Sequence, residues 1–534
     1  MKRLAGPLFL LATVVVLYRK AIRLWWMYDD AWLLHVALAR RWTMTFTEGD
    51  TWHHVFTPLL DSTFEALIAL AGLEPSRWHA VELVLLAACA VAIYFALLLY
   101  VPATSALAGA FLFVAGAPVC TFAMQLMLIH YIEAILLGAI ATATFVVASR
   151  KTSNGLNVLS AVLYFAAMLA KEIVLPLPLL LLVLPERNWR VRARHLVFHV
   201  VAFAGYLVWR RTAVGSLMSG YGWAIALGDV PRMLLALPWK ILRTWSGSAL
   251  EIGLVALAFI AAGAAFALRT RAAIVLALLG LFLAIAPIVP SSKEVSARLT
   301  LMAWLWLCTI FAAGMARMKS ASGITLFITA AIALLVANRQ EWGEEFARSE
   351  RMSAEARTFM EIDGASLLRT PAIPPAAMVE FQWFKETFLR RARGSGWFYD
   401  DFYLCSGATL RGRRIYEYHP VRREVLEVTA RIPDFARAYC TSIRDKVPLH
   451  AEFRHRRDSL FWRFGPYAEG RWRVVLGGGL QAFDVPREDG FSLPGVGALA
   501  LRVRYQSPEG WVTYSPELNL EFAKKPELTW TRAE

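Results

Sequence analysis

The chain has 534 residues, of which 57% are hydrophobic and 20 are Trp, and its formal net charge is +15 at pH 7. With a mean hydropathy of +0.47, this composition excludes an ordinary soluble enzyme. The positive charge does not indicate a nucleic-acid-binding protein, because the basic residues are distributed over many loops and form no single stripe.

Apolar stretches that could cross a membrane recur between residues 4 and 337. Because a membrane-spanning helix needs roughly 20 mainly apolar residues, the pattern predicts about eleven spans. After residue 338 the sequence becomes charged, aromatic and rich in turns, which predicts a soluble domain over 339–534. The predicted fold is a polytopic α-helical membrane domain over 1–338 followed by a soluble α+β domain. The spans lie at about 4–27, 79–101, 103–119, 122–148, 155–170, 173–185, 195–211, 249–268, 272–289, 299–316 and 322–338.

Two adjacent carboxylates, Asp29 and Asp30, follow the first apolar stretch. Ionised groups at a membrane boundary are costly unless they pair, bind a ligand or take part in chemistry. Neighbouring positions on a helix lie about 100° apart, so one carboxylate can face a site while the other caps the next helix. The alternative is that both residues only cap a helix over Ala31–Trp42.

The first outer loop, residues 28–78, contains two predicted interfacial helices, Ala31–Trp42 and Thr63–Leu73. Between these helices, His53 and His54 follow Asp50. These side chains could hold a divalent metal, but adjacent loop histidines are also commonly solvated. The sequence therefore identifies no certain cofactor and leaves a divalent metal open.

Four short basic loops fall on the same side of the membrane if eleven spans are counted from a cytoplasmic N-terminus. An odd number of spans then exports the soluble domain. Arg19, Lys20 and Arg23, near the outer end of the first span, do not follow this pattern and would snorkel outward or face an anionic headgroup. The four loops are Arg150-Lys151, Arg187–Arg194, Arg269–Arg271 and Arg317–Lys319.

The fourth predicted span carries a histidine, a glutamate and a glutamine. His130 and Glu133 share one helical face, and Gln125 lies one turn earlier. A mutual His130–Glu133 pair would offset the energetic cost of burying these side chains. The alternative is that they form a polar wall of a donor cavity.

In the soluble domain, Glu341–Glu361 and Glu380–Arg393 are predicted helices. Alternating apolar residues in 499–505 and 511–522, joined by a Ser-Pro-Glu-Gly turn, predict a hairpin of a small β-sandwich. Cys405 and Cys440 are the only cysteines of this domain, so export would favour a disulfide between them. Asp400-Asp401 is interpreted as a turn.

Several motifs in this order resemble the GT-C glycosyltransferases that use polyprenyl-phosphate sugars, a group that includes protein O-mannosyltransferases and the aminoarabinose transferase of lipid A. The resemblance covers about residues 1–338 and not the soluble domain. The motifs are Tyr28-Asp29-Asp30-Ala31-Trp32, Phe56–Asp61, Gly72–Pro75, Trp78–Glu82, Leu169–Ile173 with Leu175-Pro176, and more faintly Pro287–Arg298.

The resemblance implies that Asp29 is the general base of an inverting transfer and that Asp30 is the second acidic residue. A departing polyprenyl phosphate needs cations at the outer interface, because it cannot leave the bilayer. The candidates are Lys171, Arg210, Arg211, Lys293 and Arg298, although cations at helix ends can also merely snorkel. His53, His54 and Glu172 are possible donor or acceptor contacts.

The implied partners are a polyprenyl-phosphate-linked sugar, membrane lipid, and an acceptor that is a lipid, a glycan or a protein. The preference for Arg over Lys suggests a GC-rich bacterial genome, hence an inner-membrane protein with a periplasmic C-terminal domain. Two alternatives are a transporter or flippase for a lipid-linked sugar, which would have inverted repeats and broken helices, and an inert anchor for the C-terminal domain.

Overall fold

The computed structural model divides the chain into two compact units. We call Met1–Ser353 the helical unit and Ala354–Glu534 the C-terminal unit. The structure describes residues 4–27, 29–39, 45–49, 55–182, 184, 189–216, 230–285, 297–361, 367–369, 396–398, 400–406, 414–419, 424–456, 459–476, 481–492, 498–521 and 526–533.

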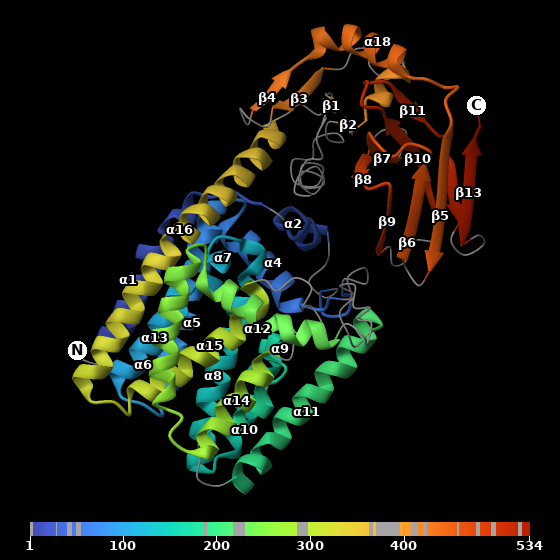
Figure 1. Cartoon of the computed structure of the whole chain (residues 1–534). Helices are drawn as coiled ribbons and strands as arrows, with labels where there is room; N and C mark the ends of the chain where they lie inside the picture. The colour runs from blue at the N-terminus through green and yellow to red at the C-terminus, as the bar shows by residue number, and fades with distance from the viewer. Residues whose placement is uncertain are drawn as a thin grey trace. The chain divides into compact units, whose positions relative to one another are not determined.

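The helical unit is a bundle of apolar helices, with two short helices of the first loop, α2 and α4, at one end (Figure 1). Its first half contains α1 (Ala5–Tyr18), η1 (Arg19–Arg23), α2 (Asp30–Ala39), α4 (Pro58–Ala71), α5 (Pro75–Leu97), α6 (Ala103–Ala115), α7 (Ala117–Phe122), η2 (Leu126–Leu128), α8 (Ile129–Lys151) and α9 (Asn154–Ala170). Its second half contains η3 (Glu172–Val174), α10 (Leu177–Leu182), α11 (Trp189–Val214), α12 (Val230–Ser246), α13 (Leu250–Ala265), α14 (Arg271–Ile285), α15 (Ala297–Met315) and α16 (Ser320–Glu361).

Six of the described helices are long and apolar enough to cross a membrane, or seven if one bent pair counts as a span. The bent pair joins Leu235–Ser246 to Leu250–Ala265 at 101°. Four shorter apolar helices coincide with further predicted stretches: Ala103–Ala115, Asn154–Ala170, Glu172–Leu182 and Ala273–Ile285. The structure thus supports an integral membrane protein, while the number of eleven spans stays a prediction.

Small residues let the helices of the bundle approach closely. A Cβ on Gly314 would lie 1.9 Å from the Gly263 carbonyl oxygen, so α13 and α15 touch through their backbones. A Cβ on Gly116 would lie 2.3 Å from the indole nitrogen of Trp304, which is fully buried and donates to the Phe113 carbonyl at 3.1 Å.

The first-loop helices were predicted, with different ends. The structure describes α2 over Asp30–Ala39 and α4 over Pro58–Ala71, where Pro58 at the first turn suits a helix start. Residues Val230–Ser246, before α13, form the helix α12. The boundary expected at residue 338 falls inside α16, a single helix of 42 residues.

Within the residues that the structure describes, the C-terminal unit contains three sheets, ordered β2-β1-β3-β4, β11-β10-β7-β8 with β12 beside β10, and β13-β5-β6-β9. Its helical elements are η6 (Asp401–Ser406), η7 (Thr429–Arg431) and α18 (Ile432–Ser442). Its strands are β1 (Leu367–Arg369), β2 (Gly396–Phe398), β3 (Ile415–His419), β4 (Glu424–Glu427), β5 (Leu449–Arg456), β6 (Ser459–Gly465), β7 (Arg471–Leu476), β8 (Gln481–Val485), β9 (Glu488–Ser492), β10 (Ala498–Gln506), β11 (Val512–Tyr514), β12 (Leu518–Glu521) and β13 (Glu527–Arg532).

The C-terminal unit is rich in β-strands, and the second strand of the predicted hairpin is divided into β11 and β12. Phe453 and Trp462 of one sheet share a buried core with Leu501 and Val503 of the other. Strand β10 pairs antiparallel with β11 and with β12, after a turn that ends at Gly510. Gly510 has a φ of +93°, which favours glycine.

The predicted disulfide between Cys405 and Cys440 is confirmed. It joins η6 to α18 across a separation of 35 residues, with the two Cα atoms 5.7 Å apart. Closing a loop of 35 residues should stabilise the C-terminal unit by about 4 kcal/mol in a chain-entropy treatment.

Thiol labelling of the unfolded protein checks this bond. Without reductant, we expect Cys89, Cys120 and Cys308 to label, because they are free, and Cys405 and Cys440 to label only after reduction. Full labelling of Cys405 and Cys440 before reduction would mean that the disulfide does not form in the cell.

Candidate functional site

The two carboxylates Asp29 and Asp30 occupy different environments at the start of α2. Asp29 is exposed, and its carbonyl oxygen accepts the Leu33 N–H at 3.0 Å, as an N-terminal helix residue does. Asp30 is buried, and its Oδ2 accepts the Met27 N–H at 2.8 Å. Asp30 therefore closes the turn from η1 into α2, while Asp29 is exposed.

Burial decides the protonation of Asp30. Removal from water raises the pKa of its carboxyl well above the usual range, and the Met27 N–H only partly opposes this. The nearby negative charges of Glu82 and Asp29 raise that pKa further. The ionised form of Asp30 is thus disfavoured, which suits a structural group better than a general base.

A cluster of charged residues surrounds the end of α9. Lys171 follows α9 in an extended conformation, and its Nζ lies 3.6 Å from Glu172 Oε2 and 5.2 Å from the centre of the Tyr131 ring. Arg210 of α11 is buried and forms an ion pair with Glu172. Its Nη1 also lies 3.4 Å from the Tyr206 hydroxyl.

Lys171 and Arg298 both act electrostatically on the buried side chain of His130, so α9, α15 and α8 bring their polar ends to one region. Arg298 is exposed in the first turn of α15. Asp30 is connected to the same region, because the backbone of Met127 in η2 lies near both its carboxyl and the His130 ring. Arg211 is exposed, one position beyond Arg210 on α11.

The predicted pair between His130 and Glu133 is wrong. Glu133 accepts a hydrogen bond from the Thr63 hydroxyl of α4 at 2.6 Å, and Gln125 donates to Glu345 of α16 at 2.8 Å. The reason is that α4 and α16 reach this end of α8 from distant parts of the sequence. A sequence pattern along α8 does not contain those partners.

Four candidates, Asp50, His53, His54 and Lys293, lie outside the described residues. Within the described part of the chain, no group of three or more His, Cys, Asp or Glu side chains could hold a metal ion.

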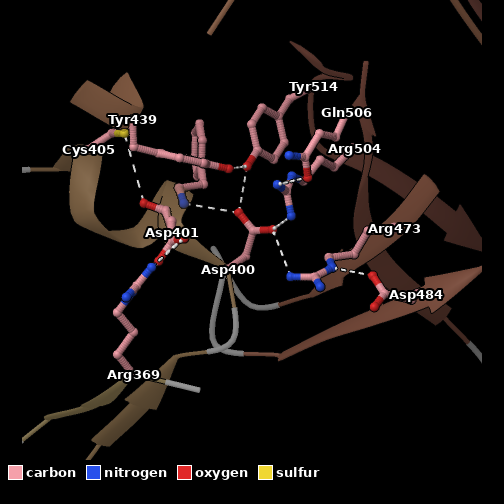
Figure 2. A network of polar contacts seen from close by, with 11 residues as sticks. Arg369, Asp400, Asp401, Cys405, Tyr439, Arg473, Asp484, Arg504, Gln506 and Tyr514 are labelled. Atoms are coloured by element: carbon pink, nitrogen blue, oxygen red, sulfur yellow. Dashed lines mark hydrogen bonds and ion pairs between the residues drawn. The ribbon is translucent and has the colours of Figure 1, made fainter. Parts of the chain in front are cut away.

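A second polar network, missed in the sequence, surrounds Asp400 of the C-terminal unit (Figure 2). Asp400 is fully buried, and its Oδ1 accepts from the Tyr514 hydroxyl at 2.6 Å and from the Phe402 N–H at 3.0 Å. Its Oδ2 lies 3.2 Å from Arg504 and 3.8 Å from Arg473. The interpretation of Asp400 as a turn residue was therefore incomplete.

The network has an electrostatic reason. Arg504 of β10 and Arg473 of β7 are directly opposite in the sheet, and like charges in such positions repel. The Asp400 carboxylate between them neutralises part of this repulsion. The sequence gives no sign of this network, because only the pairing of β7 with β10 brings the two arginines together.

Asp401 belongs to a neighbouring ion-pair group. Arg369 of β1 binds both carboxylate oxygens of Asp401, at 2.7 and 3.0 Å (Figure 2). It also donates to Glu417 of β3 at 2.6 Å. The Arg369 guanidinium lies 3.9 Å from the centre of the Phe435 ring on α18. These contacts tie β1, η6 and α18 together, so we assign both aspartates a structural role.

The sequence matches no family model and no curated protein sequence. Among solved structures, the chain is similar to the crystal structure of an Archaeoglobus fulgidus oligosaccharyltransferase in complex with Zn and sulfate, with a TM-score of 0.42 and 12% sequence identity. The similarity covers 90% of this chain and 73% of that chain. A TM-score and an identity of this size do not establish a shared family or activity.

Proposed function

We propose that the protein is an integral membrane glycosyltransferase that moves a sugar from a polyprenyl-phosphate donor to an acceptor on the exoplasmic face, with inversion. The observation that carries this proposal is the different burial of two adjacent aspartates at the start of α2. An exposed carboxylate, Asp29, lies beside a buried one, Asp30, and Asp30 is linked through Met127 to the region of Lys171 and Arg298.

In the proposed reaction, Asp29 removes the proton from an acceptor hydroxyl or amine. The acceptor atom then forms a bond to the anomeric carbon of the sugar, while the bond from that carbon to the phosphate oxygen breaks. The electron pair of the broken bond stays on the lipid phosphate, whose increased negative charge needs nearby cations.

Lys171 and Arg298 are the best candidates to bind this phosphate. Arg210 is already bound to Glu172 and is buried, so we assign it to positioning Glu172. Arg298 is exposed in the first turn of a 19-residue helix, where backbone N–H groups also favour an anion. We assign Glu172, beside Lys171, to contact with the sugar or the acceptor.

Alanine substitution of Lys171 and Arg298 tests the assignment. A charge-assisted hydrogen bond contributes about 1.5–3 kcal/mol, so each substitution should raise the donor concentration for half-maximal rate about 10- to 100-fold. Arg269→Ala is the matched control, because this exposed arginine belongs to a loop predicted on the opposite side of the membrane. Unchanged donor requirements in both variants would contradict the assignment.

The same proposal assigns the C-terminal unit to an oxidising compartment, such as the periplasm of a bacterium whose inner membrane holds the helical unit. The Cys405–Cys440 disulfide supports this placement, because disulfides form and persist in oxidising compartments.

A transporter or flippase of a lipid-linked sugar is the second candidate. The 101° bend between Leu235–Ser246 and Leu250–Ala265 favours it, since transporters often use discontinuous helices. Mass spectrometry of cell-envelope glycans with and without the gene, and with an Asp29→Asn copy, separates the two candidates. A glycosyltransferase predicts that one sugar is lost in the deletion and is not restored by the Asn copy. A transporter predicts restoration by both copies.

A further inference from the structure

The continuation of α16 beyond its apolar part, residues 339–353, packs against the chain that leads into Asp29. We call this segment the α16 extension. Its contacts with the segment before Asp29 join residues more than 300 positions apart in the sequence, as the 328-residue separation of Trp25 and Ser353 shows.

The most specific of these contacts is reciprocal. The Trp25 N–H donates to Ser353 Oγ at 3.1 Å, and the Ser353 hydroxyl donates to the Trp25 carbonyl at 2.9 Å. Residues 24–27 lie outside regular secondary structure, so their backbone groups depend on such partners. Ser353 is 5% exposed, and one side chain therefore binds both polar groups of one residue in a buried place.

The other contacts lie on the same face of the helix. The Trp342 ring packs edge-on against Tyr18 at 6.3 Å, and Lys20 Nζ lies 5.3 Å from the centre of the Phe346 ring. Glu345 is buried and accepts from Gln125 at 2.8 Å. Positions 342, 345, 346 and 353 are spaced by one or two helical turns, so the α16 extension presents one continuous face to the residues around η1 and just before η2.

These contacts hold both segments that surround Asp30. On one side, Ser353 binds Trp25, which is two residues before Met27, and the Met27 N–H donates to Asp30 Oδ2. On the other side, Glu345 binds Gln125, which is two residues before Met127, the residue whose backbone lies near the Asp30 carboxyl. A displacement of the α16 extension would therefore move the turn that carries Asp29.

We propose that the α16 extension positions the turn that carries Asp29, and that Ser353 is a positioning residue for Asp29. The inference rests on the proposed transferase function. Ser353 touches neither donor nor acceptor, and it acts by fixing the backbone at Trp25. A misplacement of about 1 Å at a reacting group can reduce the rate about 100-fold, which sets the expected scale.

The experiment compares Ser353→Ala with the wild-type full-length protein in lipid, by steady-state transfer and by hydrogen exchange. We expect kcat to fall about 10- to 100-fold per folded molecule, with the KM values for donor and acceptor nearly unchanged. The Trp25 and Met27 amides should exchange faster. Ser353→Thr, which keeps the hydroxyl, should restore most of the rate, and Glu350→Ala, on the exposed face of the same helix, should behave as the wild type.

A purely structural role of Ser353 predicts a different result, namely less folded protein with a normal kcat per folded molecule. That result, or wild-type exchange at Trp25 and Met27 in Ser353→Ala, would overturn the proposal. If Ser353→Ala does not fold, Gln125→Leu tests the second attachment with the same readouts. Failure of the transferase function itself is recognised separately. The wild type would then transfer no sugar, or Asp29→Asn would transfer it as fast as the wild type, while the exchange result still reports on Ser353.

Discussion

Asp29→Asn should remove nearly all sugar transfer while leaving the protein folded in the membrane. Asn keeps the shape of the side chain, and the carbonyl that accepts the Leu33 N–H belongs to the backbone and is unchanged. The substitution removes the base, which is typically worth about 10²- to 10⁴-fold in rate. Initial rates at saturating donor and acceptor, normalised to folded protein, measure the effect.

Asp30→Asn is the matched control for this substitution. Burial disfavours the ionised form of Asp30, and an Asn amide resembles the neutral carboxyl and can still accept the Met27 N–H. We therefore expect Asp30→Asn to retain much more activity than Asp29→Asn. Equal, small losses of stability at both positions with normal turnover would mean that the two residues only cap α2.

Asp400→Ala should strongly destabilise the C-terminal unit. It removes the carboxylate between Arg473 and Arg504 and leaves Arg504, which is 8% exposed, without this counter-ion. Breaking a buried ion pair in this way typically costs about 3–5 kcal/mol of unfolding free energy. Denaturant-dependent proteolysis of the C-terminal unit, in the full-length protein, measures the loss.

Asp484→Ala provides the comparison for Asp400. Asp484 lies 2.7 Å from Arg473, but its side chain is 57% exposed, and exposed ion pairs contribute less than about 1 kcal/mol. Similar losses in the two variants would contradict the conclusion that the buried network organises this unit.

The sequence was sufficient for features that depend on local pattern. Apolar runs predicted most of the helices, the alternation in 499–505 predicted β10, and the isolation of Cys405 and Cys440 in one domain predicted their bond. The end of the membrane domain was harder to predict. At residue 338 the composition changes while the helix continues, so α16 extends to Glu361.

Features that depend on distant partners were not predictable from the sequence. The partners of Asp400 come from β7, β10 and β11, which follow it by more than 70 residues, as the separations of 104 and 114 to Arg504 and Tyr514 illustrate. Likewise, nothing in the Asp29-Asp30 dipeptide indicates which carboxylate is buried. That difference arises only when the turn packs near Glu82 and Met127.

The proposal that this chain transfers a sugar from a lipid phosphate is tested most directly with purified protein in lipid bicelles. The protein is supplied with a synthetic polyprenyl-phosphate sugar of known anomeric configuration and with an envelope-lipid acceptor extract, and the product is examined by NMR and mass spectrometry. The account predicts release of free polyprenyl phosphate and a glycosylated acceptor of inverted configuration, both absent with Asp29→Asn. Translocation of the intact donor across a vesicle membrane without release of the phosphate, equally in the wild type and in Asp29→Asn, would contradict it.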